Sequence, residues 1–285
     1  MAGMGCDAAI LIPSKNRHAS LAQTLPSALA NGVPVWICDQ SPQPFPIPKL
    51  PPGAPPLRVL HRPDLPGLPQ ARNALLAACP ARLAIFIDDD CDLAPDFAAQ
   101  ACRLADQEDQ CHAWGPVIEG RSRRQRQLTR LSQWGSLRDP RRLLSGPGDA
   151  WSKALFGCAF AVRRASAAAI GGFASDRCGY CLGEDLDFFL RLHRAGMPCR
   201  FATCLRAVHR EDSCGRADRH ARGAAKARFW LWLARRHGAG NPATLLHLAL
   251  ALAGAASGQG REPASLGGVL KGLCHPQADR YRPAR

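Results

Sequence analysis

The sequence predicts an α/β fold in which helices flank a mostly parallel sheet, followed by a helical C-terminal region. Three observations predict this. Short apolar runs alternate with helix-like segments over residues 8–87. The last of these runs, residues 83–87, leads directly into a cluster of aspartates, and ligand crevices of α/β sheets open at such strand ends. From residue 215 onward the chain is basic and helical in character.

The first two strands are expected at residues 8–12 and 33–38, which are short and apolar. A polar turn, Pro13-Ser-Lys-Asn-Arg17, follows the first strand, and Ser20 is a suitable N-cap for the next helix. The segment 41–56 is rich in proline and cannot form a helix. It is therefore expected to be an extended surface excursion, dispensable for ligand binding.

A third short strand, residues 57–60, precedes a helix over residues 66–76, where Pro69 is tolerated in the first turn. Residues 83–87 are uninterruptedly apolar, as in a strand buried on both faces. Four carboxylates follow this strand within five positions: Asp88, Asp89, Asp90 and Asp92. Such neighbours repel one another unless a cation neutralises them, and hard oxygen ligands suit Mg²⁺ or Mn²⁺. The alternative is a solvated acidic turn that caps the following helix.

The second half of the chain continues the alternation. A strand is expected at residues 114–118, and the arginine-rich segment 121–142 is expected to be a long excursion. Residues 165–170 suit a short helix that ends at a glycine pair. A further helix begins at Glu184 and Asp185, because an apolar stripe at helical spacing follows them. Their charge is favourable at a helix N-terminus.

Composition narrows the classes of protein. Among 285 residues, Lys and Arg number 37 and Asp and Glu 23, a net charge of +14 that favours an anionic partner. The 13 cysteines are scattered, and no secretory signal precedes them, so free thiols in a reducing, cytoplasmic compartment are expected. No run of 18 apolar residues indicates a transmembrane helix.

The chain is expected to divide into a domain of residues 7–214 and a basic helical region of residues 215–285. In that region a basic helix, residues 216–237, contains aromatic residues, and an apolar helix, residues 245–256, is too short to span a bilayer. Basic and aromatic character together suit the headgroup region of an anionic membrane. The alternative is that these helices pack on the domain of residues 7–214 or form a dimer contact.

Two common nucleotide-binding motifs, G-x-G-x-x-G and G-x-x-x-x-G-K-[ST], are absent after the first strand, which argues against a nicotinamide dehydrogenase and a P-loop enzyme. Seven other motifs occur in order: residues 12–17, 39–41, 67–73, 88–90, Gly157, 171–173 and 183–185. Over about residues 7–210 the chain thereby resembles the family 2 glycosyltransferases, inverting enzymes with the GT-A fold. It departs from the family pattern at Lys15, at Cys38 and in the loop from Gly172 to Glu184, which is slightly long.

The resemblance implies a role for each matching residue. Asp185, with Glu184, would be the catalytic base that deprotonates the acceptor hydroxyl. Asp88, Asp90 and His209 would hold Mn²⁺ or Mg²⁺ against the diphosphate of the donor. The donor itself would be bound by Pro13, Ser14, Asn16, Asp39, Arg72 and Asp89.

Several of these residues also have simpler explanations. Asp39 could cap a turn, Glu184 and Asp185 could cap a helix, His209 could be a structural histidine, and Arg72 could pair with a surface carboxylate. Cys178 and Cys181 have the spacing of a redox or zinc pair, but no second pair accompanies them, which favours incidental thiols.

The leading functional hypothesis is therefore a metal-dependent inverting glycosyltransferase. Its partners would be a UDP-, GDP- or dTDP-linked sugar donor and a glycan or lipid-linked acceptor, as in polysaccharide biosynthesis. It would be cytoplasmic, with peripheral association with the inner face of the membrane left open, and would not bind nucleic acid. Two other classes remain: a nucleic-acid-binding protein, suggested by the net charge, and a non-catalytic sugar-binding protein on the same fold.

Overall fold

The computed structural model describes residues 6–119, 150–152, 154–179, 181–210, 212, 218–237, 249 and 265–281. Two predicted segments fall largely outside these residues, namely the arginine-rich segment 121–142 and the apolar helix 245–256. All statements below refer to the described part of the chain.

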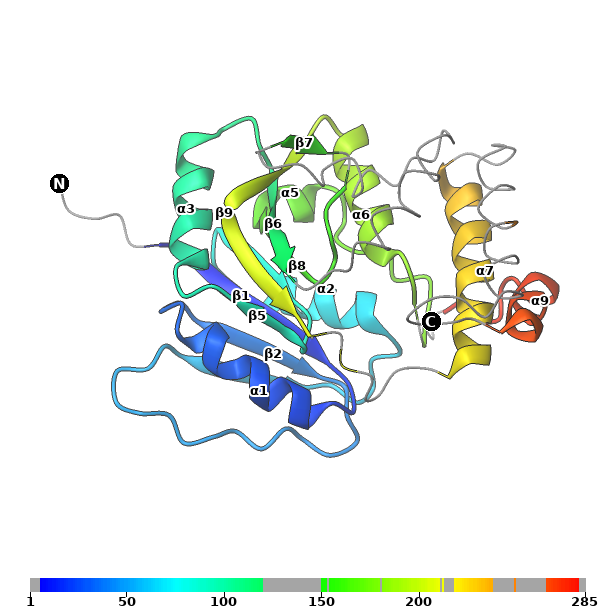
Figure 1. Ribbon diagram of the computed structural model, residues 1–285, viewed down its shortest axis with the longest axis horizontal. Coiled ribbons are helices and arrows are strands. Elements are labelled where there is room, and N and C mark those ends of the chain that lie inside the picture. The colour runs from blue at the N-terminus through cyan, green and yellow to red at the C-terminus, as the bar shows by residue number, and fades with distance from the viewer. Residues whose placement is uncertain are drawn as a thin grey trace.

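A mixed sheet forms the centre of the molecule (Figure 1). Its strand order is β3-β2-β1-β4-β8-β6-β9-β5, and β7 pairs with β9. The strands are β1 (Ala8–Ser14), β2 (Val35–Asp39), β3 (Leu57–His61), β4 (Leu83–Ile87), β5 (Cys91–Leu93), β6 (Ala113–Glu119), β7 (Ala150–Ser152), β8 (Ala159–Arg163) and β9 (Cys199–His209). The first four strands in sequence are mutually parallel, as predicted. The sheet becomes mixed because β8 runs antiparallel to β4 and β6.

Helices cover both faces of this sheet, and the alternating side chains of β1 explain why. Ile10 and Ile12 point to one face, where α1 and α3 pack, whereas Ala9 and Leu11 point to the face covered by α2, α6 and α7. The helices are α1 (His18–Leu29), α2 (Leu68–Ala78), α3 (Phe97–Gln107), α5 (Arg164–Ala169), α6 (Glu184–Arg194), α7 (Arg219–His237) and α9 (Leu266–Cys274). The α/β fold class predicted from the sequence is confirmed.

The proline-rich segment 41–56 differs from its expectation in one respect. It contains no helix or strand, as predicted, but Phe45 is buried and packs in the core beneath α1. Its backbone N–H donates to the buried carboxylate of Asp39 at 2.7 Å. The start of this segment is therefore part of the core and not only a surface excursion.

The expectation of free thiols is wrong for one pair. Cys6, just before β1, and Cys102 on α3 form a disulfide across 96 positions of sequence. Because α3 packs against the face of the sheet near the start of β1, it brings the two residues together. Among the described residues, the other ten cysteines form no disulfide, and Cys178 and Cys181 belong to these ten.

The C-terminal helix α7 packs against the same sheet face as α6. Phe229 and Leu233 of α7 join the core cluster that contains Phe188 and Phe189 of α6. Among the described helices, none is both long and apolar enough to cross a bilayer. The packing agrees with the alternative in which this region lies on the catalytic domain, and the division at residue 215 stays a prediction.

A buried ion-pair cluster joins these two helices. Asp187 of α6 is fully buried and contacts Arg191 (2.8 Å), Arg236 (2.6 Å) and His237 (2.8 Å), the last two from α7. Burial alone would raise the pKa of Asp187, but the hydrogen bond from His237 and the two arginines outweigh it and lower the pKa.

We expect Asp187→Asn to destabilise the fold by about 3 kcal/mol near neutral pH, the usual cost of leaving buried charges without their partner. A depressed carboxylate pKa gives stability that is present above the unfolded pKa of about 3.9 and is lost as the pH falls through the folded pKa. The difference in unfolding free energy between wild type and variant should therefore stay constant from about pH 7 to about pH 5 and shrink as the pH falls below about 4 in denaturant titrations. A difference that also stays constant below about pH 4 would contradict this assignment.

Candidate functional site

The aspartate cluster occupies the tight turn between β4 and β5, at the carboxyl end of β4. The turn is closed by the Cys91 N–H, which donates to the Asp88 carbonyl at 3.1 Å. His209 is the last residue of β9, which runs antiparallel to β5 with Cys91 opposite His209. This register brings His209 to Asp90, 119 positions away in sequence, with Nε2 and Oδ1 3.0 Å apart.

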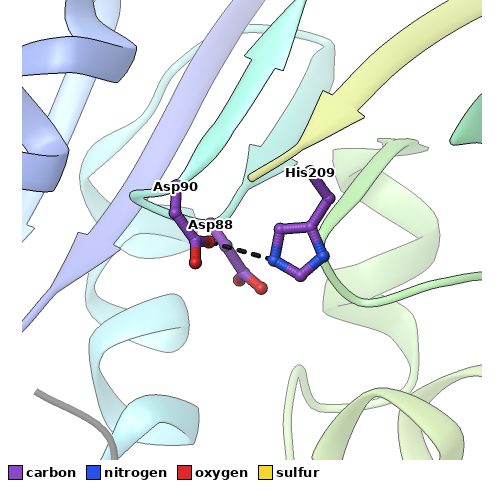
Figure 2. Close-up of side chains that lie close together, drawn as sticks. All are labelled: Asp88, Asp90 and His209. Carbon is purple, nitrogen blue, oxygen red and sulfur yellow. Dashed lines mark hydrogen bonds and ion pairs between the residues drawn. The ribbon is translucent and has the colours of Figure 1, made fainter. Parts of the chain in front are cut away.

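Asp88, Asp90 and His209 converge on one point (Figure 2). One ligand atom from each residue lies within 4.8 Å of the others. Two carboxylates and an imidazole form a donor set that Mn²⁺ accepts readily and that Mg²⁺ accepts through its oxygens. The three residues therefore fit a divalent cation, and the structure brings together the three predicted metal ligands.

The charges around Asp90 are balanced by two cationic side chains. Arg17 places Nη1 2.8 Å from Asp89 and Nη2 2.8 Å from Asp90. Burial would raise the pKa of Asp90, but the hydrogen bonds and charges of His209 and Arg17 hold that pKa well below its usual range. Burial raises the pKa of Asp88 to about 6 and that of Asp89 to about 7. The cluster thus depends on nearby positive charge to remain ionised.

Arg17 lies in the polar turn after β1, and the sequence pattern predicted no site role for it. Its guanidinium places positive charge directly beside Asp89 and Asp90. The backbone of Asp212 adds to the same contact, since its N–H donates to the Asp90 carboxylate at 3.0 Å and its carbonyl accepts from Arg17 at 3.3 Å. The sequence signal was the position of Arg17 at the end of a strand that neighbours β4.

We expect Arg17→Gln to lower the unfolding free energy of the metal-free protein by about 2 kcal/mol, the scale of hydrogen bonds to charged groups. Mn²⁺ should then raise the melting temperature of the variant more than that of the wild type, because it supplies the missing positive charge. Arg62→Gln is the control, since Arg62 and Asp64 form an ion pair of similar length with both side chains about half exposed. Equal Mn²⁺ effects in wild type and Arg17→Gln would contradict this account.

Arg72 lies beneath the cluster, with 1% of its side chain exposed. Its guanidinium contacts Asp88 at 3.2 Å and Glu184 at 3.0 Å, and donates to the Gly157 carbonyl at 2.9 Å. The rings of Phe86 and Phe173 lie 6.0 and 5.2 Å from it. Arg72 therefore has carboxylate partners, but the pairing is buried and is not the surface pairing of the alternative. It connects the aspartate cluster to the start of α6, and its donor-binding role stays a proposal.

The start of α6 places Asp185 beside residue 157. Gly183 adopts a left-handed backbone with φ 73° as the N-cap residue, and Glu184 and Asp185 follow in the first turn. The Gly157 N–H donates to Asp185 Oδ2 at 3.0 Å. A Cβ at position 157 would lie only 2.6 Å from that oxygen, so the close approach requires glycine. Burial and the neighbouring Asp185 raise the pKa of Glu184 to about 7.

The predicted donor-binding residues surround the adjoining ends of β1 and β2, where Ser14 lies opposite Asp39. Ser14 Oγ donates to Asp89 at 2.7 Å, which ties this edge to the cluster. Asn16 has a left-handed backbone, with φ 58°, and its N–H donates to Ser41 Oγ at 2.8 Å. Pro13 is buried within β1.

Asp39 is fully buried and already has partners on both oxygens. It accepts from the N–H groups of Ser41 (2.9 Å) and Phe45 (2.7 Å), and His18 Nε2 lies 3.1 Å from it. Burial would raise the pKa of Asp39, but these hydrogen bonds outweigh it and lower the pKa. The geometry matches the turn-capping alternative, and a contact with the nucleobase stays a proposal.

The model of glycosyl transferase family 2 matches residues 9–171, more than half of the chain. The chain belongs to this family. It is thus a glycosyltransferase, as the ordered motifs implied. No curated protein matches the chain in sequence. The family match includes the aspartate cluster and Gly157 but ends before Glu184, Asp185 and His209.

Solved structures of glycosyltransferases share the fold. The mannosyltransferase PcManGT from Pyrobaculum calidifontis, in complex with GDP-Man and Mn²⁺, has a TM-score of 0.57 and 17% identity, over 96% of this chain and 88% of that one. GalNAc-T7 with UDP, GalNAc and Mn²⁺ has a TM-score of 0.51 and 17% identity, over 71% of this chain and 43% of that one. This family 2 glycosyltransferase therefore spans less than half the length of GalNAc-T7, and at such identity the likeness shows the GT-A fold alone.

Proposed function

We propose that this glycosyltransferase is a metal-dependent, inverting enzyme that moves a sugar from a nucleotide-sugar donor to a hydroxyl of a glycan or lipid-linked acceptor. One observation carries the proposal: Asp88, Asp90 and His209 converge at a strand end that Arg72 connects to Glu184, next to Asp185. Both solved structures named above contain Mn²⁺ and a nucleotide or nucleotide sugar, which supports the same class of ligand here.

Each part of the site has a distinct task in this proposal. A divalent cation held by Asp88, Asp90 and His209 would stabilise the negative charge that develops on the diphosphate leaving group. Asp185 would take the proton of the acceptor hydroxyl as that hydroxyl attacks the anomeric carbon. The Gly157 N–H orients the Asp185 carboxylate, because it donates to Oδ2. A single displacement of this kind inverts the anomeric centre.

Arg17 and Ser14 would serve the donor side of the site. Arg17 contacts Asp89 and Asp90, and 16% of its side chain is accessible to solvent. A guanidinium in that place suits contact with a diphosphate. Asn16 and Asp39 would shape the nucleoside pocket in part through the backbone. The Asn16 N–H donates to Ser41, and Asp39 accepts from the N–H groups of Ser41 and Phe45, so both residues hold the turn after β2.

The acceptor and the membrane contact are the finer parts of the proposal. Leu266 and Leu270 of α9 are 42% and 50% exposed, and the neighbouring α7 is rich in arginine. Apolar tips beside basic residues suit the surface of an anionic membrane, where a lipid-linked acceptor would be presented. Salt-sensitive flotation with anionic but not neutral vesicles supports this placement, and absence of flotation with both removes it.

Calorimetric titration of UDP-, GDP- and dTDP-sugars tests the donor proposal. We expect one nucleotide class to bind in the presence of Mn²⁺ and to lose most of its affinity when the metal is chelated. Lack of binding by every donor to the folded protein would reject the proposal.

A further inference from the structure

The loop formed by residues 174–179 and 181–183 leads into the start of α6 and hence to Asp185. Its last residue, Gly183, has the left-handed backbone that begins the helix. The ring of Phe229, from α7, lies against Gly183 so closely that a Cβ at position 183 would overlap it. The C-terminal part of the chain thus contacts the residue from which the proposed catalytic helix starts.

A short backbone pairing attaches the same loop to the last described residues of the chain. The Cys178 N–H donates to the Asp279 carbonyl at 2.8 Å, and the Tyr281 N–H donates to the Asp176 carbonyl at 2.8 Å. Between these bonds, Arg177 and Arg280 form an antiparallel bridge. The C-terminal residues therefore hold one side of the loop backbone, while Gln70 of α2 donates to the carbonyls of Ser175 and Arg177 from the other elements of the fold.

Arg177 extends this attachment towards the site. It is 3% exposed, and its Nε and Nη2 contact Asp279 Oδ2 at 3.0 and 2.5 Å. Its Nη1 donates to the Leu182 carbonyl at 2.8 Å, two residues before Glu184. The ring of Trp232 lies 5.1 Å from the guanidinium, and the indole donates to Asp176 at 3.1 Å. One buried cation thereby connects Asp279 to the backbone that begins α6.

We infer that the C-terminal segment, comprising α7, α9 and residues 275–281, positions the proposed base Asp185 through this loop, with Arg177 and Asp279 as positioning residues. The inference rests on the proposed function, because it assigns the loop to Asp185 as the base. It concerns a part of the chain that lies beyond the family match, which ends at residue 171. Asp88, Asp90 and Arg17, on the donor side of the site, belong to other parts of the fold, namely the turn after β4 and the turn after β1.

The test compares full-length wild type with Asp279→Asn and Asp279→Glu. Asparagine keeps the size of the side chain and the backbone carbonyl that accepts from Cys178, but it leaves Arg177 without its counter-charge. Glutamate retains the charge and should rescue at least part of the effect. Asp106→Asn is the matched control, since Asp106 forms a 2.6 Å ion pair with Arg82 on the surface, away from the loop.

Two readouts separate positioning from a merely structural effect. Hydrogen exchange of the amides of residues 181–187 should become at least about tenfold faster in Asp279→Asn than in the wild type or the control, since weaker local contacts lower protection. The kcat for nucleoside diphosphate release should fall at least about tenfold, because misplacement by about 1 Å can cost about a hundredfold. The affinity for UDP or GDP with Mn²⁺ should stay within about twofold.

Three results would overturn the inference: unchanged exchange, faster exchange with unchanged kcat, or a loss of nucleotide affinity parallel to the loss of kcat. If the wild type transfers no sugar from any donor, the proposed function fails. The exchange measurement remains decisive in that case. Faster exchange of residues 181–187 in Asp279→Asn shows that the C-terminal segment holds the loop, and unchanged exchange rejects this attachment.

Discussion

Asp185→Asn is expected to lower kcat by about 10²–10⁴, the usual contribution of a positioned general base, while donor affinity stays close to that of the wild type. The substitution is isosteric, and the asparagine carbonyl can still accept from the Gly157 N–H that now donates to Asp185 at 3.0 Å. The side chain keeps its size but loses the ability to take a proton. Its NH2 group also cannot accept from the Leu186 N–H, which donates to Asp185 Oδ1 at 2.8 Å, so donor affinity and stability are measured beside kcat. Single-turnover transfer together with nucleotide titration separates the two quantities.

Glu184→Gln provides the sharpest comparison. Glu184 precedes Asp185 in sequence, but its carboxylate forms a buried ion pair with Arg72 at 3.0 Å. We expect a smaller loss of kcat than for Asp185→Asn, with a loss of stability because Arg72 loses one partner. If Glu184→Gln abolishes turnover and Asp185→Asn retains it, the base is Glu184 and our assignment is wrong.

Asp90→Ala is expected to abolish metal-dependent donor binding, which corresponds to an affinity loss of at least about a hundredfold for removal of a charged, buried ligand. Asp90 is 1% exposed and accepts hydrogen bonds from His209, Arg17 and the Asp212 backbone. Its replacement by alanine therefore removes a metal ligand and also the contacts that hold these three groups in position. Titration of Mn²⁺ and of nucleotide into the variant measures both losses.

Asp92→Ala is the control for Asp90→Ala. It removes a carboxylate two positions along the chain, which contacts Arg210 at 2.5 Å rather than His209. We expect metal-dependent donor binding to persist in Asp92→Ala. Equal binding in Asp90→Ala and Asp92→Ala would show that Asp90 is not a metal ligand.

The sequence predicted the elements that depend on local pattern. The uninterrupted apolar run 83–87 was correctly predicted as a buried strand, because a strand covered on both faces has no polar alternation. The aspartates then had to lie at its carboxyl end. The helix after Gly183 was also predicted, since its apolar stripe has helical spacing and its first turn is acidic.

Features set by long-range packing were beyond single-sequence reasoning. His209 meets Asp90 only because β9 runs antiparallel to β5 in one register, and a one-residue slip would turn its side chain to the other face. Its proximity was expected from the family resemblance and not from the residues. Likewise, the burial of Arg72 depends on segments far apart in sequence. Its guanidinium contacts Asp88 after β4, the Gly157 carbonyl and Glu184 at the start of α6, and none of these contacts is visible in the sequence around Arg72.

The C-terminal region illustrates the same limit. Basic and aromatic residues have similar patterns whether a helix faces a membrane or a protein core. Phe229 and Leu233 contact the core because α6 presents Phe188 and Phe189 on the same sheet face. The pairing of Arg177 with Asp279, 102 positions apart, has no signature in either segment alone.

The most direct test of metal-dependent glycosyl transfer is release of free nucleoside diphosphate from a panel of UDP-, GDP- and dTDP-sugars by the full-length protein. The account predicts that one donor class is turned over with Mn²⁺ or Mg²⁺, that chelation stops release and added metal restores it, and that Asp90→Ala gives only background. Release that is unaffected by chelation, or no release from any donor by protein shown to be folded, would contradict it.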